Sequence, residues 1–458
     1  MKRPTRADFQ ALLAFAVPMA SVQVGLMLMG VVDAAMVGRV SAEALAGTAL
    51  ANIWFFAVST IGMGTIAVLD PVISQAFGAG DNEGIARGLQ RGLLIAAIVT
   101  VPTSLGLLPV ARVLNWAGQP AAVVPLAASY ARIVVAGIFP YFAFMALREG
   151  LQALGRIRPV IVTIGLANLL NLFLNWVFIF GNLGAPPLGV AGSALATTIS
   201  RWVMALGLLA LTWHHLRFYL RPWRPETSDW APLRRMFALG LPIGFQILFE
   251  YGVFGGVGLL MGRVSAAAVA GHTIALNFAA ITFMVPFGIG GAASVLVGRA
   301  VGAGRPDDAR RVASAALIVG ASFMAVAALA FISIPHLLAA AYSPDPAVVA
   351  VSALLIPLAG VFQIFDGTQA VALGVLRGIG DTRVPVLVNL AGYYLIGLPV
   401  SLWLGFHRGL GPVGLWWGLV VGLMVVALVL VARVRIRLRA DLTRLHIDLP
   451  ADRASGIA

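Results

Sequence analysis

The composition of this 458-residue chain excludes an ordinary soluble domain, because 60% of its residues are hydrophobic and only 11% are charged, whereas soluble domains carry about 25% charged residues. The absence of cysteine excludes disulfides and cysteine-ligated metal sites. The formal net charge of +13 is compatible with nucleic-acid binding or with membrane topology, and only the positions of the basic residues distinguish the two.

Hydrophobic stretches recur along the chain, each long enough to cross about 30 Å of hydrocarbon at about 1.5 Å per helical residue. The period-two alternation of membrane barrels is absent. We therefore predict an all-α polytopic membrane protein with about twelve transmembrane helices, the first of which is too long to be a signal peptide. The predicted spans are residues 10–38, 44–77, 88–114, 121–148, 159–181, 189–214, 232–262, 268–300, 310–340, 347–376, 384–406 and 412–434.

The chain repeats itself at a separation of 224 residues, where VGRVSAEALAG at 37–47 matches MGRVSAAAVAG at 261–271. Further matches in the same frame are Pro18 with Pro242, Gly64 with Gly288, and residues 78–80 with 302–304. Two homologous halves in an apolar chain are typical of secondary transporters. Each half contains six predicted spans, so the repeats have the same orientation in the membrane.

The predicted domain boundaries follow from this repeat and from one long polar connection. We expect an N-terminal six-helix lobe at 1–214, an inter-lobe linker at 215–231, a C-terminal six-helix lobe at 232–440 and a tail at 441–458. These are two homologous six-helix lobes of one membrane protein.

The basic residues separate by side when the N-terminus is placed in the cytoplasm. Of the 31 lysines and arginines, 25 then lie on the cytoplasmic side, 5 on the opposite side, and Arg201 remains within a span. This asymmetry follows the positive-inside rule and predicts cytoplasmic termini and a cytoplasmic linker. The charge therefore indicates topology rather than nucleic-acid binding, and the basic end of the chain is expected to rest on anionic membrane lipids.

Four carboxylates fall at membrane depth, where a charge is costly and is usually functional. Asp33, Glu250 and Asp366 have no lysine or arginine at helical spacing, and Asp70 precedes a proline. An unpaired acid in such a place either takes up a proton or holds a cation, and both are ways to couple transport to an ion. The alternative is a structural role as a protonated acid that bridges two helices, which is most plausible for Asp70.

Polar residues in the fifth, sixth and tenth spans accompany these acids. Asn168, Asn171 and Asn175 have spacings of three and four, so they share one helix face. Amide groups suit sodium or a carboxyl partner, and they also bond neighbouring membrane helices together. Thr197 and Thr198 are weaker candidates, because threonine in a membrane helix usually bonds its own backbone. Gln369 follows Asp366 by three residues and is expected to orient that acid.

These motifs together resemble the multidrug and toxic compound extrusion (MATE) family over nearly the whole chain. The matching pieces are VDAAMVG at 32–38, QAFGAG at 75–80, NLFLN at 171–175 with IFG at 179–181, LGVAG at 188–192 continuing to AT at 196–197, and LRGIGDTR at 376–383. The resemblance implies two six-helix lobes around a central cleft, which export small organic cations and lipophilic drugs in exchange for sodium ions or protons. It further implies a bacterial inner (cytoplasmic) membrane location, and we expect a monomer without a cofactor.

The resemblance also assigns roles to single residues. Asp33 matches the first-span acid of the N-terminal lobe, Asn171 and Asn175 match the fifth-span pair beside it, and Pro18 matches a proline at which the first helix bends. Glu250 and Asp366 match the C-lobe carboxylates of the NorM-like branch. The residues implied in ion coupling or substrate binding are therefore Asp33, Asn171, Asn175, Thr197, Glu250, Asp366 and Gln369, with a possible sodium site at Glu250 and Asp366.

Two positions depart from the family pattern. Phe362 stands where NorM-like members often have a tyrosine, and Asn175 stands where some relatives have an aspartate. Sodium prefers oxygen ligands, so the missing phenol favours protons as the coupling ion, although the two carboxylates would still supply oxygens for sodium.

Three other functions remain open from the residues alone. The first is a lipid-linked oligosaccharide or peptidoglycan-precursor flippase of the same superfamily, whose cavity is usually cationic. The second is a channel. The third is a membrane enzyme, which is disfavoured because the chain has no histidine-rich metal cluster, nucleophile elbow or phosphate loop.

Overall fold

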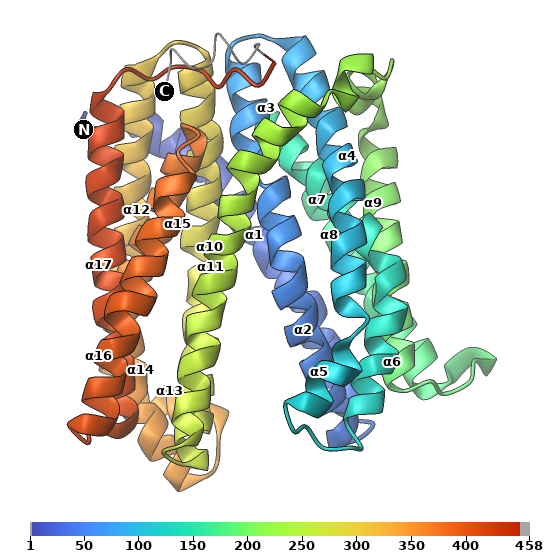
Figure 1. Ribbon diagram of the computed structural model, residues 1–458, viewed down its shortest axis with the longest axis vertical. Coiled ribbons are helices and arrows are strands. Elements are labelled where there is room, and N and C mark those ends of the chain that lie inside the picture. Colours follow the sequence, from blue (N-terminus) through green and yellow to red (C-terminus); the bar gives the residue numbers. More distant parts are fainter. Residues whose placement is uncertain (1, 449–458) are drawn as a thin grey trace. The chain divides into compact units, whose positions relative to one another are not determined.

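The computed structural model of the chain describes residues 2–448, in which every regular element is a helix (Figure 1). The helices are α1 (Arg6–Val37), α2 (Ala42–Ile66), α3 (Leu69–Gly78), α4 (Asn82–Leu107), α5 (Val110–Trp116), α6 (Val124–Val134), α7 (Ile138–Ala153), α8 (Arg158–Phe180), α9 (Val190–Leu220), α10 (Trp230–Gly262), α11 (Ala266–Gly302), α12 (Pro306–Ser333), α13 (Pro335–Tyr342), α14 (Pro346–Gly378), α15 (Arg383–Leu390), α16 (Leu398–Leu402) and α17 (Gly411–Arg439). Short 3₁₀ segments are η1 (Val135–Gly137), η2 (Asn182–Gly184) and η3 (Pro225–Ser228), and π-helical segments are η4 (Ala391–Gly397) and η5 (Trp403–His407).

Within the described residues, 12 helical segments are long and apolar enough to cross a membrane, which confirms the predicted number of spans. Three of these segments are not uniform α-helices. Ala42–Gly78 is divided between α2 and α3, Val124–Ala153 contains η1, and Arg383–His407 contains both π-helical segments. The interruptions matter because a π-helical turn shifts the direction in which side chains point and is frequent at functional sites.

Contacts divide the described chain into two compact units. Unit 1 contains residues 2–20 and 245–445, and unit 2 contains residues 21–244 and 446–448. The chain therefore changes unit inside α1 and again inside α10. Both changes fall two residues after a proline, Pro18 in α1 and Pro242 in α10. The lobes at 1–214 and 232–440 are halves of the sequence repeat and stay a prediction. The two contact-defined units differ from these halves at their first helices. The first part of α1 belongs to unit 1, and the first part of α10 belongs to unit 2.

Repeated glycines explain how each exchanged segment packs. A Cβ atom added to Gly64 of α2 would lie 2.1 Å from the backbone nitrogen of Gly244 in α10, within unit 2. A Cβ atom added to Gly288 of α11 would lie 2.6 Å from the backbone nitrogen of Ala20 in α1, within unit 1. Such close approach of two helix backbones requires small residues. The match of Gly64 with Gly288 in the sequence therefore corresponds to the same helix crossing made once in each unit.

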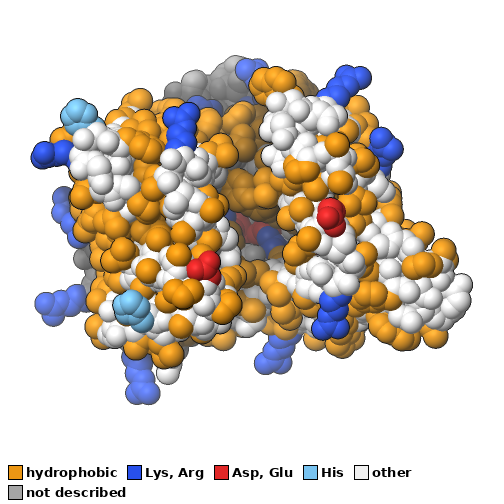
Figure 2. Space-filling model, turned by 90° about the horizontal axis from the view of Figure 1, so that it is seen from below, with side chains coloured by type: hydrophobic (Ala, Val, Ile, Leu, Met, Phe, Trp, Pro, Cys, Tyr) orange, Lys and Arg blue, Asp and Glu red, His pale blue; other side chains and the backbone are white. Residues whose placement is uncertain are grey.

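Each unit surrounds a small number of buried polar side chains with packed helices. In unit 2, α8 packs against α9, and α7 packs against α4 and α9. In unit 1, α14 packs against α11, α12 and α17 (Figure 1). Figure 2, seen from below and along the helices, shows hydrophobic side chains interspersed with backbone and uncharged polar groups. Large hydrophobic side chains along the helices are exposed, among them Leu169, Leu259 and Val326, as expected for helices whose outer faces contact lipid. The buried polar groups are therefore the places in each unit where function is to be sought.

Candidate functional site

The first candidate site surrounds the carboxylate of Asp33, which is 3% exposed and lies in the part of α1 that belongs to unit 2. Oδ1 of Asp33 accepts a hydrogen bond from Nδ2 of Asn175 at 2.6 Å, and Oδ2 accepts one from Oγ1 of Thr197 at 2.8 Å. Nδ2 of Asn175 also donates to Oδ1 of Asn171 at 3.1 Å. The structure thus brings four of the residues singled out in the sequence together, from α1, α8 and α9.

The two asparagine amides leave polar atoms unused beside this carboxylate. Nδ2 of Asn171 and Oδ1 of Asn175 are buried and have no hydrogen-bond partner among the described residues. A buried polar atom without a partner costs about 1–3 kcal/mol. An unused donor and an unused acceptor next to a carboxylate are features of a site that accommodates a further polar group or a cation.

Tyr130 and Arg201 extend the surroundings of Asp33 within unit 2. Tyr130 is 2% exposed, and its hydroxyl lies beside Thr197 and Asn52. Arg201 interacts electrostatically with Asp33, although the described contacts include no ion pair between the two. Neutral donors, rather than a salt bridge, therefore hold the Asp33 carboxylate in place.

The second candidate site lies in unit 1, around Glu250 of α10. Nε2 of Gln369 donates a hydrogen bond to Oε1 of Glu250 at 3.0 Å, and the hydroxyl of Tyr393 lies 3.4 Å from the same oxygen. The Tyr393 hydroxyl also donates to Oε1 of Gln369 at 3.2 Å. Asp366, which is 7% exposed, interacts electrostatically with Glu250. Two carboxylates, an amide and a phenol thus meet from α10, α14 and η4.

Gln369 differs from its expected role. It shares a face of α14 with Asp366, but its described hydrogen bonds are with Glu250 and Tyr393. The residue therefore connects α14 to α10 and to the π-helical segment η4. The spacing within α14 was informative about the face, but it carried no information about which neighbouring helix that face meets.

A phenol is present in this second site, although Phe362 is not its source. The ring of Phe362 packs edge-to-face against Phe254 at 5.7 Å and Trp416 at 5.8 Å, inside an aromatic cluster. Tyr393 of η4 supplies the hydroxyl instead. The expectation that unit 1 lacks a phenol oxygen, drawn from Phe362 alone, is therefore wrong.

The other residues considered in the sequence lie apart from these two clusters. Pro18 is inside α1. Nδ2 of Asn168 donates to the backbone oxygens of Gly25 and Ile164, and Thr198 donates to the oxygen of Ile133. These two side chains therefore connect helices or satisfy backbone groups. Asp70 is buried in the first turn of α3 and interacts with Arg148, so it lies in a separate ionic region.

Sequence reasoning missed two participants. Tyr393 carried no local signal, because its partners lie 24 and 143 residues away in the chain. Arg201 did carry a signal, since it was the one basic residue that the topology left within a span. Its meaning became visible only in the structure, where the hydrogen bond from Thr197 to Asp33 joins α9 to α1 one turn before Arg201.

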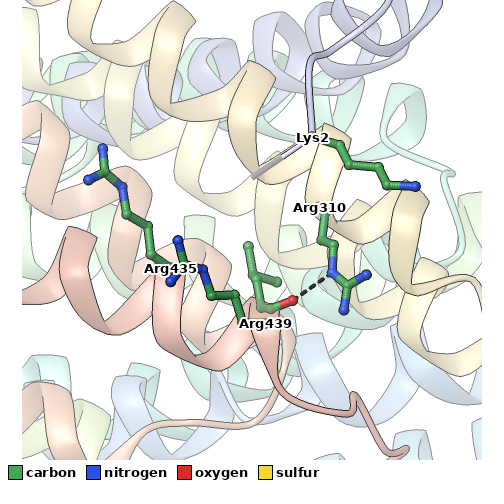
Figure 3. Close-up of a pocket in the computed structure, with 5 residues that line it drawn as sticks. Lys2, Arg310, Arg435 and Arg439 are labelled. Carbon is green, nitrogen blue, oxygen red and sulfur yellow. Dashed lines mark hydrogen bonds between the residues drawn. The ribbon is translucent and has the colours of Figure 1, made fainter.

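A pocket of about 290 Å³ in unit 1 has the opposite charge character. Figure 3 shows its basic lining of Lys2, Arg310, Arg435 and Arg439. Nε of Arg310 donates to the backbone oxygen of Leu438 at 2.6 Å. A positive pocket at the ends of membrane helices suits an anionic lipid headgroup and repels cationic compounds. It is therefore distinct from the two acidic clusters.

Twelve spans in repeated halves, with buried carboxylate clusters at membrane depth, define a multi-pass membrane transporter. A family model described as MatE matches residues 18–177 and 242–403. The chain is 37% identical to the "Probable multidrug resistance protein NorM" of Mesorhizobium japonicum over 440 residues, which cover 93% of this chain and 94% of the relative. It is also 37% identical to the "Multidrug resistance protein PmpM" of Pseudomonas aeruginosa, with 93% and 91% covered.

Among solved structures, the eukaryotic MATE transporter AtDTX14 is similar, with a TM-score of 0.85 and 25% identity over 94% of this chain and 99% of that one. The chain belongs to the MATE family. It is therefore a transporter and not an enzyme, and the resemblance read from its motifs is confirmed.

Proposed function

We propose that the chain exports lipophilic and cationic drugs across the bacterial inner membrane in exchange for protons or sodium ions. The observation that carries this proposal is the Asp33 cluster, in which a buried carboxylate is held by Asn175 and Thr197 rather than by a basic residue. Such an acid is ready to bind a cation or a proton. The names of the NorM and PmpM relatives support drugs as cargo.

Exchange follows if the coupling ion and the drug compete for the same carboxylate. In the cytoplasm-facing state the drug displaces the ion, and in the outward-facing state the ion displaces the drug. Coupling then arises because the two ligands favour opposite directions of the cycle. Exchange of one monovalent ion for one monocationic drug moves no net charge, so a tenfold ion gradient of about 1.4 kcal/mol supports at most about a tenfold drug gradient.

The second cluster contributes a further place for the coupling ion. Glu250, Asp366 and Gln369 offer oxygen atoms within unit 1, and Tyr393 adds a hydroxyl. Oxygen ligands are those that sodium prefers, whereas two neighbouring carboxylates also suit a shared proton. The argument against sodium from Phe362 therefore falls, because Tyr393 supplies a phenol oxygen beside Glu250.

The test is rhodamine 6G uptake into inside-out membrane vesicles with imposed gradients, because the export direction leads into the lumen of such vesicles. Vesicles free of sodium with a pH gradient, and vesicles at equal pH with a sodium gradient, are compared with vesicles that lack the transporter. Transport driven by the pH gradient and abolished by a protonophore identifies protons as the coupling ion. Transport that requires sodium and ignores the protonophore identifies sodium. Transport under neither gradient would overturn the antiport proposal.

We further propose that both termini and the linker at 215–231 are cytoplasmic and that the protein acts as a monomer. The distribution of 25 basic residues on one side and 5 on the other supports this topology. Ser228 is exposed in the linker, and the chain has no native cysteine. A Ser228→Cys variant is expected to react with an impermeant maleimide only after the cells are opened, and labelling in intact cells would contradict the topology.

A further inference from the structure

Arg201 of α9 is a buried cation that forms no ion pair with a carboxylate among the residues that the structure describes. Its side chain is 9% exposed, and its Nη1 atom has no hydrogen-bond partner among the described residues. The guanidinium carbon lies 4.3 Å from the ring centroid of Phe55 and 4.9 Å from that of Tyr141. The two rings contact each other edge-to-face at 5.6 Å. The cation therefore lies against two aromatic rings, one from α2 and one from α7, in the angle that the two rings form.

The neighbouring backbone and side chains fix this position further. A Cβ atom added at Gly137 would lie 3.3 Å from Cδ of Arg201, so η1 packs directly against the stem of the arginine. The Tyr141 hydroxyl is directed to the sulfur of Met63, at 3.5 Å, and does not accept from Arg201. Two aromatic rings and a close backbone thus position a guanidinium whose hydrogen-bonding capacity is left partly unused.

The position of Arg201 relates it to the acid of the same unit. Thr197, which donates to Asp33, precedes Arg201 by four residues, which is one turn and about 6 Å along α9. Arg201 and Asp33 interact electrostatically. They are close enough for each to feel the charge of the other, but no salt bridge between them is present among the described contacts.

This arrangement is costly unless the charge itself has a use. A buried cation without a paired anion is destabilising, and apolar replacements of buried charges are often neutral or stabilising. A purely structural role would be filled as well by an uncharged side chain between Phe55 and Tyr141. The positive charge matters instead to any ligand that binds at Asp33, because charges interact strongly where water is excluded.

We propose that Arg201 sets the cation affinity of the Asp33 site by acting as an internal positive charge that opposes every cation bound there. The inference rests on the proposed role of Asp33 as the place of exchange. Arg201 weakens the hold of Asp33 on drug or ion enough for one to displace the other. Without the arginine charge, the carboxylate binds its cation too tightly and releases it slowly.

The test is equilibrium binding of rhodamine 6G, a permanent monocation at neutral pH, to the purified full-length protein, measured by fluorescence anisotropy. Neutral variants Arg201→Gln and Arg201→Met are compared with Arg201→Lys, which keeps the charge. Arg217→Gln is the matched control. It removes the same charge from an exposed position of α9, sixteen residues and about 24 Å further along the helix, beyond the screening length of about 8–10 Å.

The neutral variants are expected to bind rhodamine 6G roughly fivefold to tenfold more tightly, from the loss of one repulsive charge near a partly screened site. Arg201→Lys and Arg217→Gln are expected to stay within about twofold of the unmodified protein. The same neutral variants are expected to show slower maximal efflux in vesicles, because release of the cation becomes limiting.

A double-mutant cycle separates this electrostatic role from a structural one. In an Asp33→Asn background, Arg201→Gln is expected to tighten the weaker remaining binding by a similar factor, because the arginine repels a bound cation directly and does not act through the carboxylate. Unchanged or weakened binding in Arg201→Gln and Arg201→Met, or a tightening that disappears in the Asp33→Asn background, would overturn the inference. The same holds if both neutral variants fail to fold while Arg201→Lys folds, since that shows a structural requirement for the charge.

The cycle also distinguishes failure of this inference from failure of the proposed function. If Asp33→Asn binds rhodamine 6G as tightly as the unmodified protein, Asp33 is not the place of exchange and both ideas fall. If Asp33→Asn weakens binding but the neutral Arg201 variants do not tighten it, only the role of Arg201 is lost.

Discussion

The Asp33 cluster of unit 2 and the Glu250 cluster of unit 1 lie in two halves of a repeated sequence, but they are not copies of each other. The residue 224 positions after Asp33 is Val257, and the residue 224 positions before Glu250 is Leu26. The acid on α10 therefore lies two turns earlier in its helix than the acid on α1. The helix crossing at Gly64 and Gly288 is the same in both units, whereas the two polar clusters occupy different positions of the repeat.

The two clusters also differ in formal charge. Asp33 has a single carboxylate with Arg201 nearby, so the pair is neutral when both groups are ionised and no ligand is bound. Glu250 and Asp366 interact with each other and with neutral groups, so their cluster carries two negative charges when both are ionised. The comparison indicates a division of roles. The neutral cluster exchanges its ligand readily, and the doubly acidic cluster retains a cation or a proton more firmly.

Removing the carboxylate of Asp33 is expected to have the largest effect. Asp33→Asn keeps the size of the side chain and its bond with Asn175, but it loses the charge that drug and ion compete for. Efflux is expected to fall by more than about tenfold at unchanged membrane expression, measured as rhodamine 6G transport in vesicles. Asp345→Asn is the matched control, because this exposed residue only caps α14 and asparagine is an equally good cap. Normal efflux by well-expressed Asp33→Asn protein would show that transport does not need the Asp33 carboxylate, and the role given to the Asp33 cluster would be lost.

Neutralising the second cluster is expected to have an intermediate effect, because one carboxylate remains after each single change. Glu250→Gln and Asp366→Asn are each expected to reduce efflux by roughly threefold to tenfold. The double variant is expected to be less impaired than the product of the two single effects, since both acids act on one cation. Initial rates under saturating ion gradients measure this. Losses as complete as that of Asp33→Asn would show that the two clusters have equal roles.

The sequence predicted the spans well because length and hydropathy depend on each helix alone. It did not predict that α1 and α10 each divide between two units, since this depends on which helices pack together. The π-helical turns of residues 383–407 were also missed, because a shift in hydrogen bonding leaves the apolar pattern nearly unchanged.

The same limit applies to the clusters. The spacing of Asn171 and Asn175 correctly placed both amides on one helix face, but it could not name Asp33 as their partner without the family resemblance. Gln369 was assigned to Asp366 by spacing, and the structure joins it to Glu250 across 119 residues. Local periodicity determines faces, and contacts between distant segments require the fold.

Removing the hydroxyl of Tyr393 tests the Glu250 cluster alone, and its effect on transport is expected to be smaller than that of removing a carboxylate. Tyr393→Phe keeps the buried ring and its packing against Phe254, but it loses the hydrogen bond to Gln369 and the contact with Glu250. One lost bond of this kind costs about 0.5–1.5 kcal/mol, so a roughly twofold to tenfold reduction in ion affinity is expected. The ion concentration that gives half-maximal efflux measures this, and an unchanged value would exclude the hydroxyl from ion binding.

The smallest effect is expected for Phe362→Tyr, which restores the residue often present in NorM-like members. Phe362 is 1% exposed and lies between the rings of Phe254 and Trp416. A hydroxyl added to this apolar cluster needs a partner, and burying it without one costs about 1–3 kcal/mol of stability. The thermal midpoint is therefore expected to fall by a few degrees.

Transport by Phe362→Tyr is expected to stay within about twofold, with the same coupling ion, because Tyr393 already supplies a phenol to the cluster. The variant is compared with the unmodified protein in the two gradient assays, after equal reconstitution is verified. A gain of sodium dependence in Phe362→Tyr would show that the position of the phenol, rather than its presence, selects the ion. The role assigned to Tyr393 in the unit 1 cluster would then have to be abandoned.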